Sequence, residues 1–522
     1  MSVDKIEYTV EDIEKQKKSG EGKDGKDGIF EVDKTEGAVK ETEYTVLPIL
    51  NKLAAKLSAE TKGIERVTDE EKTDTSILNA ASMWFSANMV IAAFALGALG
   101  PAVFGLNFWM SVIATVLFTF IGLFPVAYFS IFGVEFGLRQ MVLSRFLMGN
   151  VTARIFCLIN VVACIGWGAV NTIAAASLLH MVNPDGARCP PWVACFIITI
   201  LTVIVTFFGY KVIHAYEKWS WVPNFVVFLI IIARLKISGN FTAGDWDHKS
   251  VDAGAFLSFG GVIFGSASGW ATYAADYTVY MPSNTNRYKI FFSLVAGLSF
   301  PLCFTCILGA AAAMCIRSDP VWNRYYNDYS IGGLCYAILV ENSLSRFGEF
   351  CCVVLAMSTV ANNIPNMYSI ALSTQALWAP LARIPRVAWT LLGNLLTLAI
   401  AIPAYYKFES FMTIFMDAIA YYLAIYIAIS LTEHFVFRRS FQAYNAKDWN
   451  RWDKLPIGYA SFVALFVGAI GVALGMSSEY WQGQISRALF DLFGDIGFEV
   501  AAIFTFIVYI ILRPLEIKYT GR

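Results

Sequence analysis

Charged residues are scarce in this chain. Asp, Glu, Lys and Arg make up 15% of its 522 residues, against about 25% in ordinary soluble proteins. Hydrophobic residues reach 57%, with 41 phenylalanines, and the net charge is −1. This balance excludes a typical globular protein and gives no sign of nucleic-acid binding. It indicates a polytopic membrane protein.

Several motifs are missing as well. No Gly-rich loop followed by Lys and Ser or Thr occurs, which disfavours an ATP-driven pump. The 10 cysteines lack the spacing of a metal site, and the 4 histidines suggest no catalytic arrangement. The sequence therefore predicts neither a metal centre nor an enzyme. We also expect no cleaved signal peptide, since no basic segment, apolar run and small-residue cleavage site stand in order near the start.

The few charged residues are densest near the N-terminus. Residues 1–78 are predicted to be a cytoplasmic tail, largely disordered, because a sequence such as KSGEGKDGKDG buries too little apolar surface to offset chain entropy. Within it, residues 46–60 are predicted to form a short helix on the bilayer surface. Residues 79–512 are predicted to be the transmembrane domain, and residues 513–522 a short cytoplasmic C-terminal tail.

Hydropathy predicts about 12 spans, since a helix needs about 20 apolar residues to cross the hydrocarbon. The candidate spans lie near 83–104, 108–131, 155–180, 191–209, 221–235, 255–277, 290–315, 350–377, 387–403, 410–431, 457–476 and 497–512. Residues 317–348 are predicted to form a surface or re-entrant helix on the outer side. Basic residues gather on the side of the N-terminus, so both termini are predicted to be cytoplasmic.

Two of these spans carry signs of interruption. Ser86 and Asn88 lie in the first span, and the sixth, SFGGVIFGSASGWATYAAD, is rich in Gly and Ser. Such residues weaken a helix unless the backbone unwinds or packs closely, and both alternatives are open. The two spans are five apart, as an inverted repeat of five helices requires. Transporters bind substrates at such interrupted helices.

Polar and aromatic side chains gather in three spans. Trp167 and Asn171 are four residues apart in the third span and share one helix face. Trp270 adjoins the Gly-rich part of the sixth span. Amides in apolar surroundings are costly unless satisfied, so they either bridge helices or, with indole faces, bind a flat neutral heterocycle. The eighth span has the densest polar set: Asn362, Asn363, Pro365 and Asn366.

Few ionisable residues fall within the spans. Asp417 is the deepest, whereas Asp276 and Glu135 lie near predicted cytoplasmic helix ends. A carboxylate within the membrane is a candidate for proton relay. The alternative is a carboxylate bonded to neighbouring tyrosines or backbone.

Six segments closely resemble the fungal purine-cytosine permeases of the nucleobase–cation symporter family. The resemblance runs from about residue 59 to the end. It implies an all-α fold of five-plus-five inverted repeats with two extra helices. It also implies plasma-membrane uptake of cytosine, adenine, guanine and hypoxanthine by alternating access, with the proton as coupling ion and no cofactor. The segments are ETKGIERVTDEEKTDTSILNAASMWFSANMV, GNVTARIFCLINVVACIGWGAVNT, GYKVIHAYEKWSWVPN, GWATYAADYTVYMP, ANNIPNMYSIALSTQALW and RPLEIKYTGR.

The resemblance further implies a substrate site in which Trp167 and Trp270 sandwich the base. We expect Asn363 and Asn366, with Asn171 opposite, to contact the polar edge of the base. Asp417, Asp276 and Glu135 are the proton-coupling candidates. The expected partners are nucleobases and the lipid bilayer, and nothing in the sequence specifies an oligomeric state. The implied substrate-binding residues are Ser86, Trp167, Asn171, Trp270, Asn362, Asn363, Pro365 and Asn366.

Two other functions remain open from the sequence. One is a permease for a different flat heterocycle, such as a vitamin or a nucleoside. The other is a nutrient sensor that uses the same scaffold without transporting its ligand.

Overall fold

Helices form nearly all the regular structure in the described part of the chain. The computed structural model describes residues 63–182, 189–207, 218–244, 252–491 and 494–522. All of them belong to one compact unit, and within them the β structure is a single bridge between Ser477 and Gln482. The predicted surface helix at 46–60 lies outside the described residues.

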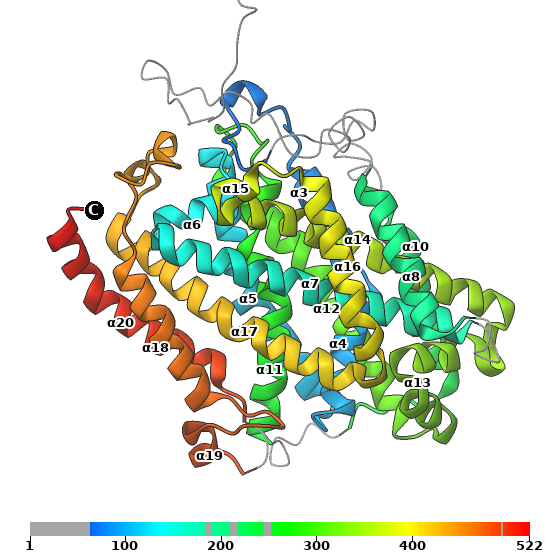
Figure 1. The fold of residues 1–522 in the computed structure, drawn as a ribbon. Helices are drawn as coiled ribbons and strands as arrows, with labels where there is room; N and C mark the ends of the chain where they lie inside the picture. The colour runs from blue at the N-terminus through cyan, green and yellow to red at the C-terminus, as the bar shows by residue number, and fades with distance from the viewer. Residues whose placement is uncertain (1–62, 183–188, 208–217, 245–251, 492–493) are drawn as a thin grey trace, which may run out of the picture. The chain divides into compact units, whose positions relative to one another are not determined.

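Each of the twelve predicted spans coincides with a described helix or group of helices (Figure 1). Four shorter or connecting helices are α6 (Gln140–Met148), α13 (Pro320–Leu339), α15 (Ala379–Ala382) and α19 (Gln484–Leu489). The spans are α3 (Ile77–Asn88) with α4 (Ile91–Ala102), α5 (Phe108–Phe136), α7 (Asn150–Met181), α8 (Pro191–Phe207), α10 (Trp221–Ser238), α11 (Ala253–Ser268) with η3 (Gly269–Thr272) and η4 (Ala274–Tyr277), α12 (Arg287–Ile316), α14 (Arg346–Leu377), α16 (Arg386–Ala404), α17 (Phe408–Thr432), α18 (Tyr459–Gly475) and α20 (Gly497–Thr520).

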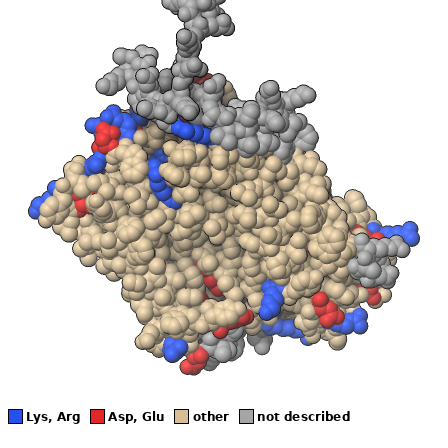
Figure 2. Space-filling model, viewed as in Figure 1, with Lys and Arg blue, Asp and Glu red and all other residues tan. Residues whose placement is uncertain are grey.

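The distribution of charge is that of a multi-pass membrane protein. Seven continuous helical stretches in the described chain are long and apolar enough to cross a bilayer, and one of them, Arg386–Arg438, contains both α16 and α17. The helices α8 and α18 are apolar but shorter. Figure 2 shows Lys, Arg, Asp and Glu at the two ends of the visible face, with a broad band of other residues between them.

The first span is broken between α3 and α4, whose axes differ by 55°. A break leaves backbone groups unpaired, and the bilayer core offers no water to satisfy them. Three side chains from two other helices, α10 and α14, bond these groups instead. The bonds are Asn362 Nδ2 to Ala87 O (2.5 Å), Asn224 Nδ2 to Met89 O (3.3 Å) and Ile91 N to Ser358 Oγ (3.1 Å).

The sixth span both unwinds and packs closely. Its α-helix ends at Ser268 and continues as the 3₁₀ turns η3 and η4. A Cβ at Gly265 would lie 2.3 Å from the carbonyl oxygen of Met416, and one at Gly269 would lie 3.0 Å from the Trp167 ring. Small residues are therefore required at Gly265 for close contact with α17, and at Gly269 to leave room for the Trp167 ring.

Residues 317–348, predicted as a surface or re-entrant helix, contain α13. Asp319 caps the N-terminus of this helix by accepting bonds from two backbone amides. The helix is interrupted at Tyr329 and Ser330, where Ser330 has φ 56°. Its first half is mostly exposed, and most of its second half, Ile331–Leu339, is buried.

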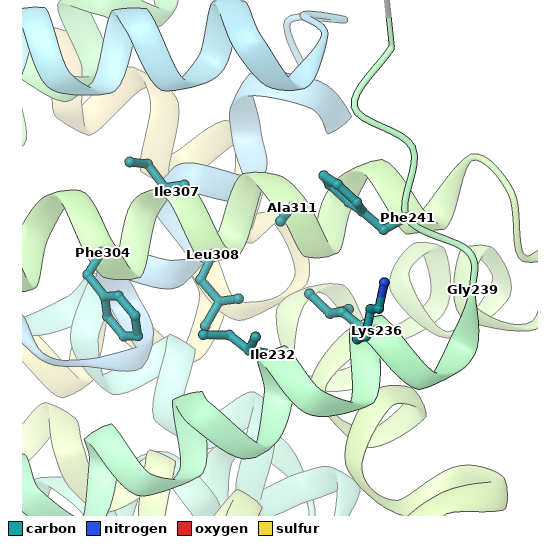
Figure 3. Close-up of a pocket in the computed structure, with 9 residues that line it drawn as sticks. Ile232, Lys236, Gly239, Phe241, Phe304, Ile307, Leu308 and Ala311 are labelled. Atoms are coloured by element: carbon teal, nitrogen blue, oxygen red, sulfur yellow. The ribbon is translucent and has the colours of Figure 1, made fainter.

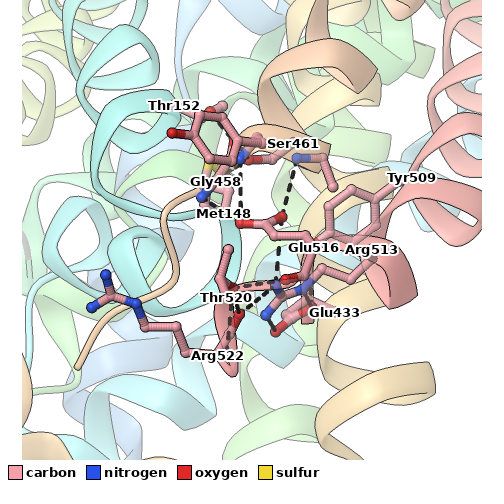
Figure 4. A network of polar contacts seen from close by, with 12 residues as sticks. Met148, Thr152, Glu433, Gly458, Ser461, Tyr509, Arg513, Glu516, Thr520 and Arg522 are labelled. Atoms are coloured by element: carbon pink, nitrogen blue, oxygen red, sulfur yellow. Dashed lines mark hydrogen bonds and ion pairs between the residues drawn. The ribbon is translucent and has the colours of Figure 1, made fainter. Parts of the chain in front are cut away.

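A buried ionic network holds the C-terminal helices together (Figure 4). Arg513 donates two bonds to the Glu433 carboxylate, at 2.8 and 2.9 Å, and Tyr509 donates a third at 3.0 Å. Glu516 accepts bonds from the backbone amides of Gly458 and Ala460 at the start of α18. Residues 513–520, predicted as the beginning of a C-terminal tail, are thus the last part of α20. They join it to the turn η7 (Glu433–Arg438) that follows α17, and to α18.

Residues 63–76, predicted as the end of the N-terminal tail, lie against the end of α5. The Val67 amide donates to the Gly137 carbonyl at 2.8 Å. The Lys72 ammonium donates to the Val134 carbonyl at 2.9 Å and forms an ion pair with Asp69 at 3.0 Å. Hydrogen bonds from Ser283 and Lys72 hold the pKa of Asp69 below its ordinary value.

We expect Arg513→Ala to lower the melting temperature of the detergent-solubilised protein substantially. The Arg513 and Glu433 side chains are 2% and 0% exposed, and removing one partner of a buried pair typically costs about 3–5 kcal/mol. Arg451→Ala is the control, because its pair with Asp453 is exposed to solvent, which screens the attraction, and its loss should change the melting temperature little. Equal melting temperatures for the two variants would contradict the stabilising role of the network.

Both termini are expected to be cytoplasmic. An epitope tag inserted after residue 520 should be reached by antibody only after the cells are permeabilised. Labelling of intact cells would reverse the predicted orientation of every span.

Candidate functional site

A cavity of about 360 Å³ lies where both interrupted spans meet α7, α12, α14 and α17. Only about 20 Å³ of this space is wide enough to admit a water molecule, so the lining side chains close around it. No residue with a formal charge lines it. The residues that line it are Asn88, Val90, Ala92, Ala93, Leu96, Trp167, Val170, Asn171, Ser266, Trp270, Leu302, Asn362, Met412 and Met416.

Two indoles form the aromatic part of this central cavity. Trp270 comes from η3, and its Nε1 donates to the Asn88 side chain at 3.3 Å. Its ring packs edge-on against Trp84, with the ring centroids 4.8 Å apart. Trp167 comes from α7 and packs edge-on against Phe415 of α17 at 5.6 Å. The two rings therefore reach the cavity from different helices, each held by a second aromatic ring.

Three amides join α7 to α14 beside the indoles. The Asn171 Nδ2 donates to Asn362 Oδ1 at 2.7 Å and to Asn363 Oδ1 at 2.9 Å. Asn171 is fully buried and Asn362 is 5% exposed. The Asn362 amide also donates to the Ala87 carbonyl at the break between α3 and α4. One side chain therefore connects that break to the wall of the cavity.

Two polar atoms of the cavity residues have no hydrogen-bond partner. They are the Trp167 Nε1, a donor, and the Asn171 Oδ1, an acceptor, and both are buried. An unsatisfied buried polar atom costs free energy unless a ligand or water completes it. A heterocycle that presents a ring nitrogen and an N–H group would satisfy both atoms.

The other predicted binding residues lie beside the cavity and do not line it. Ser86 is fully buried in α3, two residues before Asn88. The Asn363 Nδ2 points to Thr202 of α8 at 3.4 Å. Asn366 accepts a bond from the Tyr273 hydroxyl at 2.9 Å and donates to the Asn362 carbonyl at 3.1 Å. Pro365 is buried within a continuous α14.

Two of the three proton-coupling candidates have firm partners. The Asp276 carboxylate accepts a 2.7 Å bond from the Gln140 backbone amide, and Asp276 is 5% exposed. Glu135 forms an ion pair with Arg287. These contacts attach η4 and α12 to neighbouring segments at the end of α5.

Asp417, the third candidate, follows the cavity residue Met416 and forms no ion pair within the described chain. It lies close enough to Asp495 for an electrostatic interaction. The Tyr421 hydroxyl, one turn further along α17, donates to Asp495. Burial raises the pKa of Asp495, although bonds from Tyr421 and two backbone amides oppose the shift. Glu499 of α20 carries a buried oxygen without a partner.

The sequence did not single out Met412 and Met416, which form the α17 wall, or Asp495. Methionines in an apolar span give no signal, because they pack equally well in a core. Asp495 lies in a connection between α19 and α20, and its approach to Asp417 depends on how the last helices fold back.

A larger pocket, with about 1,100 Å³ of empty space, lies between α10 and α12 (Figure 3). Its lining is apolar apart from Lys236 and backbone, and includes Leu235, Phe304 and Leu308. Exposed apolar residues such as Ile232 and Ile237 flank it on α10. Apart from Lys236 it lacks side-chain donors and acceptors that would orient a heterocycle, so the central cavity is the better candidate for a substrate site.

Interrupted helices around a closed, uncharged cavity define a secondary transporter by their architecture. Residues 66–483 match a family described as permeases for cytosine/purines, uracil, thiamine and allantoin. The chain belongs to this family.

Individual relatives agree with this assignment. The chain is 65% identical to the purine-cytosine permease FCY2 of Saccharomyces cerevisiae, over 93% of this chain and 91% of that protein. It is 45% identical to the purine-cytosine permease fcyB of Emericella nidulans, over 91% and 92%. The vitamin B6 transporter TPN1 of Saccharomyces cerevisiae is more distant, at 29% identity over 91% and 90%.

The fold is also that of a solved transporter. Mhp1, a nucleobase-cation-symport-1 family transporter in a closed conformation with bromovinylhydantoin bound, aligns with a TM-score of 0.65. The alignment covers 88% of this chain and 95% of that one at 14% identity, so it establishes the fold alone.

We expect Trp167→Phe to weaken substrate affinity without reducing the amount of protein at the cell surface. The change removes an N–H that has no partner in the protein, so folding loses no bond, whereas a bound ligand loses one. An unpaired ligand group typically costs about 1–3 kcal/mol, or roughly tenfold to hundredfold in affinity.

Two other variants provide controls for uptake affinity and surface labelling. Trp389→Phe removes an indole N–H that bonds the Leu381 carbonyl away from the cavity, and affinity should stay normal. Asn366→Ala breaks the bond to Tyr273, and we expect it to reduce surface protein first. Normal affinity for Trp167→Phe would remove this donor from the binding site.

Proposed function

We propose that the protein takes up nucleobases across the plasma membrane by proton symport with alternating access. The observation that supports this most directly is the central cavity. Its lining includes two indole rings, one donor and one acceptor that have no partner, and no fixed charge. Cytosine and the purines adenine, guanine and hypoxanthine are flat and neutral, and carry donors and acceptors on one edge. A zwitterionic or anionic substrate would instead need a charged partner or an exposed helix end.

The closest alternative is another flat heterocycle. The match to a vitamin B6 transporter shows that this scaffold serves such a role in a relative, but at much lower identity than the match to purine-cytosine permeases. A sensor that binds without transporting is the alternative of a different class. Uptake separates the three possibilities.

The experiment is uptake of radiolabelled cytosine by fungal cells that lack their own nucleobase permeases and express this chain. Concentrative uptake, inhibited by excess unlabelled adenine and not by pyridoxine, is expected. Inhibition by pyridoxine alone would favour the vitamin alternative. Saturable binding without accumulation would favour a sensor.

We propose that the proton is carried by the carboxyl groups around Asp417. In a site with little water, two nearby carboxylates cannot both be charged without a large cost, so such a pair retains a proton. Within the described chain no basic side chain pairs with Asp417, Asp495 or Glu499. Asp417 adjoins a residue of the cavity wall, and this gives protonation a route to influence the substrate site.

Asp417→Asn is therefore expected to abolish accumulation of cytosine against its gradient while leaving binding to the purified protein within about twofold. The amide keeps the size of the side chain and removes its titration. Asp453→Asn is the matched control, because Asp453 is exposed and pairs only with Arg451 within the described chain. Accumulation should be measured across external pH. An unaltered pH profile for Asp417→Asn would exclude Asp417 as the coupling group.

A further inference from the structure

A second polar cavity, with about 860 Å³ of empty space, lies between α13, α7, the turn η6 (Tyr405–Lys407) and the start of α17. We refer to it as the α13 cavity. It lies on the side predicted to face outward, and the substrate site described above does not include it. Its main polar and aromatic lining is His180, Tyr326, Tyr329, Ser330, Tyr405 and Glu409.

The lining of the α13 cavity has a defined chemical preference. Three ring systems approach one another there: the His180 ring lies 6.0 Å from that of Tyr329 and 6.4 Å from that of Tyr405, centroid to centroid. Glu409 and Asp328 supply carboxylate oxygens, and no Lys or Arg is among the lining residues. Such a surface favours a flat, neutral or weakly basic molecule with N–H donors, and disfavours an anion.

The α13 cavity and the central cavity share two walls. On α7, Asn171 lines the central cavity and Ile173 lines the α13 cavity. On α17, Met412 lines the central cavity and Phe408 lines the α13 cavity. Phe408 and Met412 are four residues apart, which is about 6 Å along a helix. Ile173 and Phe408 are 0% and 2% exposed, so about one helical turn of packed apolar side chains separates the two cavities.

The interruption of α13 shapes this cavity. Ser330 has φ 56°, a conformation that a non-glycine residue rarely adopts and that costs free energy. Its hydroxyl donates to the Glu409 carboxylate, which fixes the kink against the start of α17. The second oxygen of Glu409 remains to accept a bond from a ligand. Strained backbone that is held in this way is typical of binding sites.

We propose that the α13 cavity is a second, weaker binding site that receives amino-bearing nucleobases, such as cytosine and adenine, before the central cavity opens to them. In this role Tyr329 supplies an aromatic face, and Glu409 accepts a bond from the exocyclic amino group. The inference rests on the proposed function, because it concerns the route of the same substrate. Concentrative cytosine uptake by the unaltered protein tests the proposed function first and by itself.

The first experiment measures KM and maximal rate for cytosine uptake in Tyr329 and Glu409 variants. Tyr329→Ala should raise KM roughly twofold to tenfold at an unchanged maximal rate, because one aromatic contact is lost on the approach. Tyr329→Phe keeps the ring and should resemble the unaltered protein. An unchanged KM for Tyr329→Ala at normal surface expression would overturn the proposed second site. The proposed function in nucleobase uptake would be unaffected by that result.

Glu409 requires a control for its bond to the kink. Glu409→Gln should raise KM for cytosine and adenine more than KM for hypoxanthine, which has no exocyclic amino group. Ser330→Ala removes the bond to the kink but keeps the carboxylate, and should not discriminate among the bases. Equal effects of both variants on all three bases would show that Glu409 only holds α13, and would contradict a binding role.

The second experiment counts sites on the purified protein by equilibrium dialysis with radiolabelled cytosine. Trp270→Ala weakens the central site, and we expect residual low-affinity binding that is lost when Tyr329→Ala is added. If Trp270→Ala alone removes all binding up to millimolar cytosine, the α13 cavity does not hold the base.

Discussion

The need to satisfy backbone polar groups without water governs this structure. Breaking a helix inside a bilayer exposes N–H and C=O groups that only the protein can pair. At the first break, Asn224 of α10 and Ser358 and Asn362 of α14 supply these bonds. Asn362 also accepts from Asn171 at the wall of the central cavity. The polar side chains of α14 therefore permit the interruption and at the same time shape the site that the interruption creates.

Close backbone contacts keep the broken span in place. A Cβ at Gly97 of α4 would lie 1.8 Å from the Cys306 carbonyl oxygen, so only glycine fits there without a shift of α12. Leu302, one turn earlier on α12, lines the central cavity. The half-helix α4 and α12 thus form one packed wall.

Charged side chains differ in their pairing between the helix ends and the surroundings of the central cavity. Fully paired groups, such as Glu433 with Arg513, stabilise the ends of helices. The central cavity has no charged residue, so a neutral substrate enters it without losing a strong interaction with water that the protein cannot replace. Asp417, Asp495 and Glu499 are different, because they are buried or half-buried without a cation in the described chain. A proton is the smallest charge that can neutralise such a group, and this supports the proposal that coupling takes place in this region.

The sequence by itself determined the twelve spans, the two interruptions and the residue types of the site, because hydropathy, Gly content and buried amides are local signals. It placed Trp167, Asn171, Trp270 and Asn362 in one site, and the structure brings these four to one cavity. Only the tertiary structure decided which amide side chains line that cavity and which form hydrogen bonds to other protein side chains instead. Asn363 and Asn366 differ from Asn362 through their partners Thr202 and Tyr273, which lie on α8 and just after η3. Those partners are about 90 to 160 residues away in the chain, and no local pattern can specify a contact made only when distant helices pack.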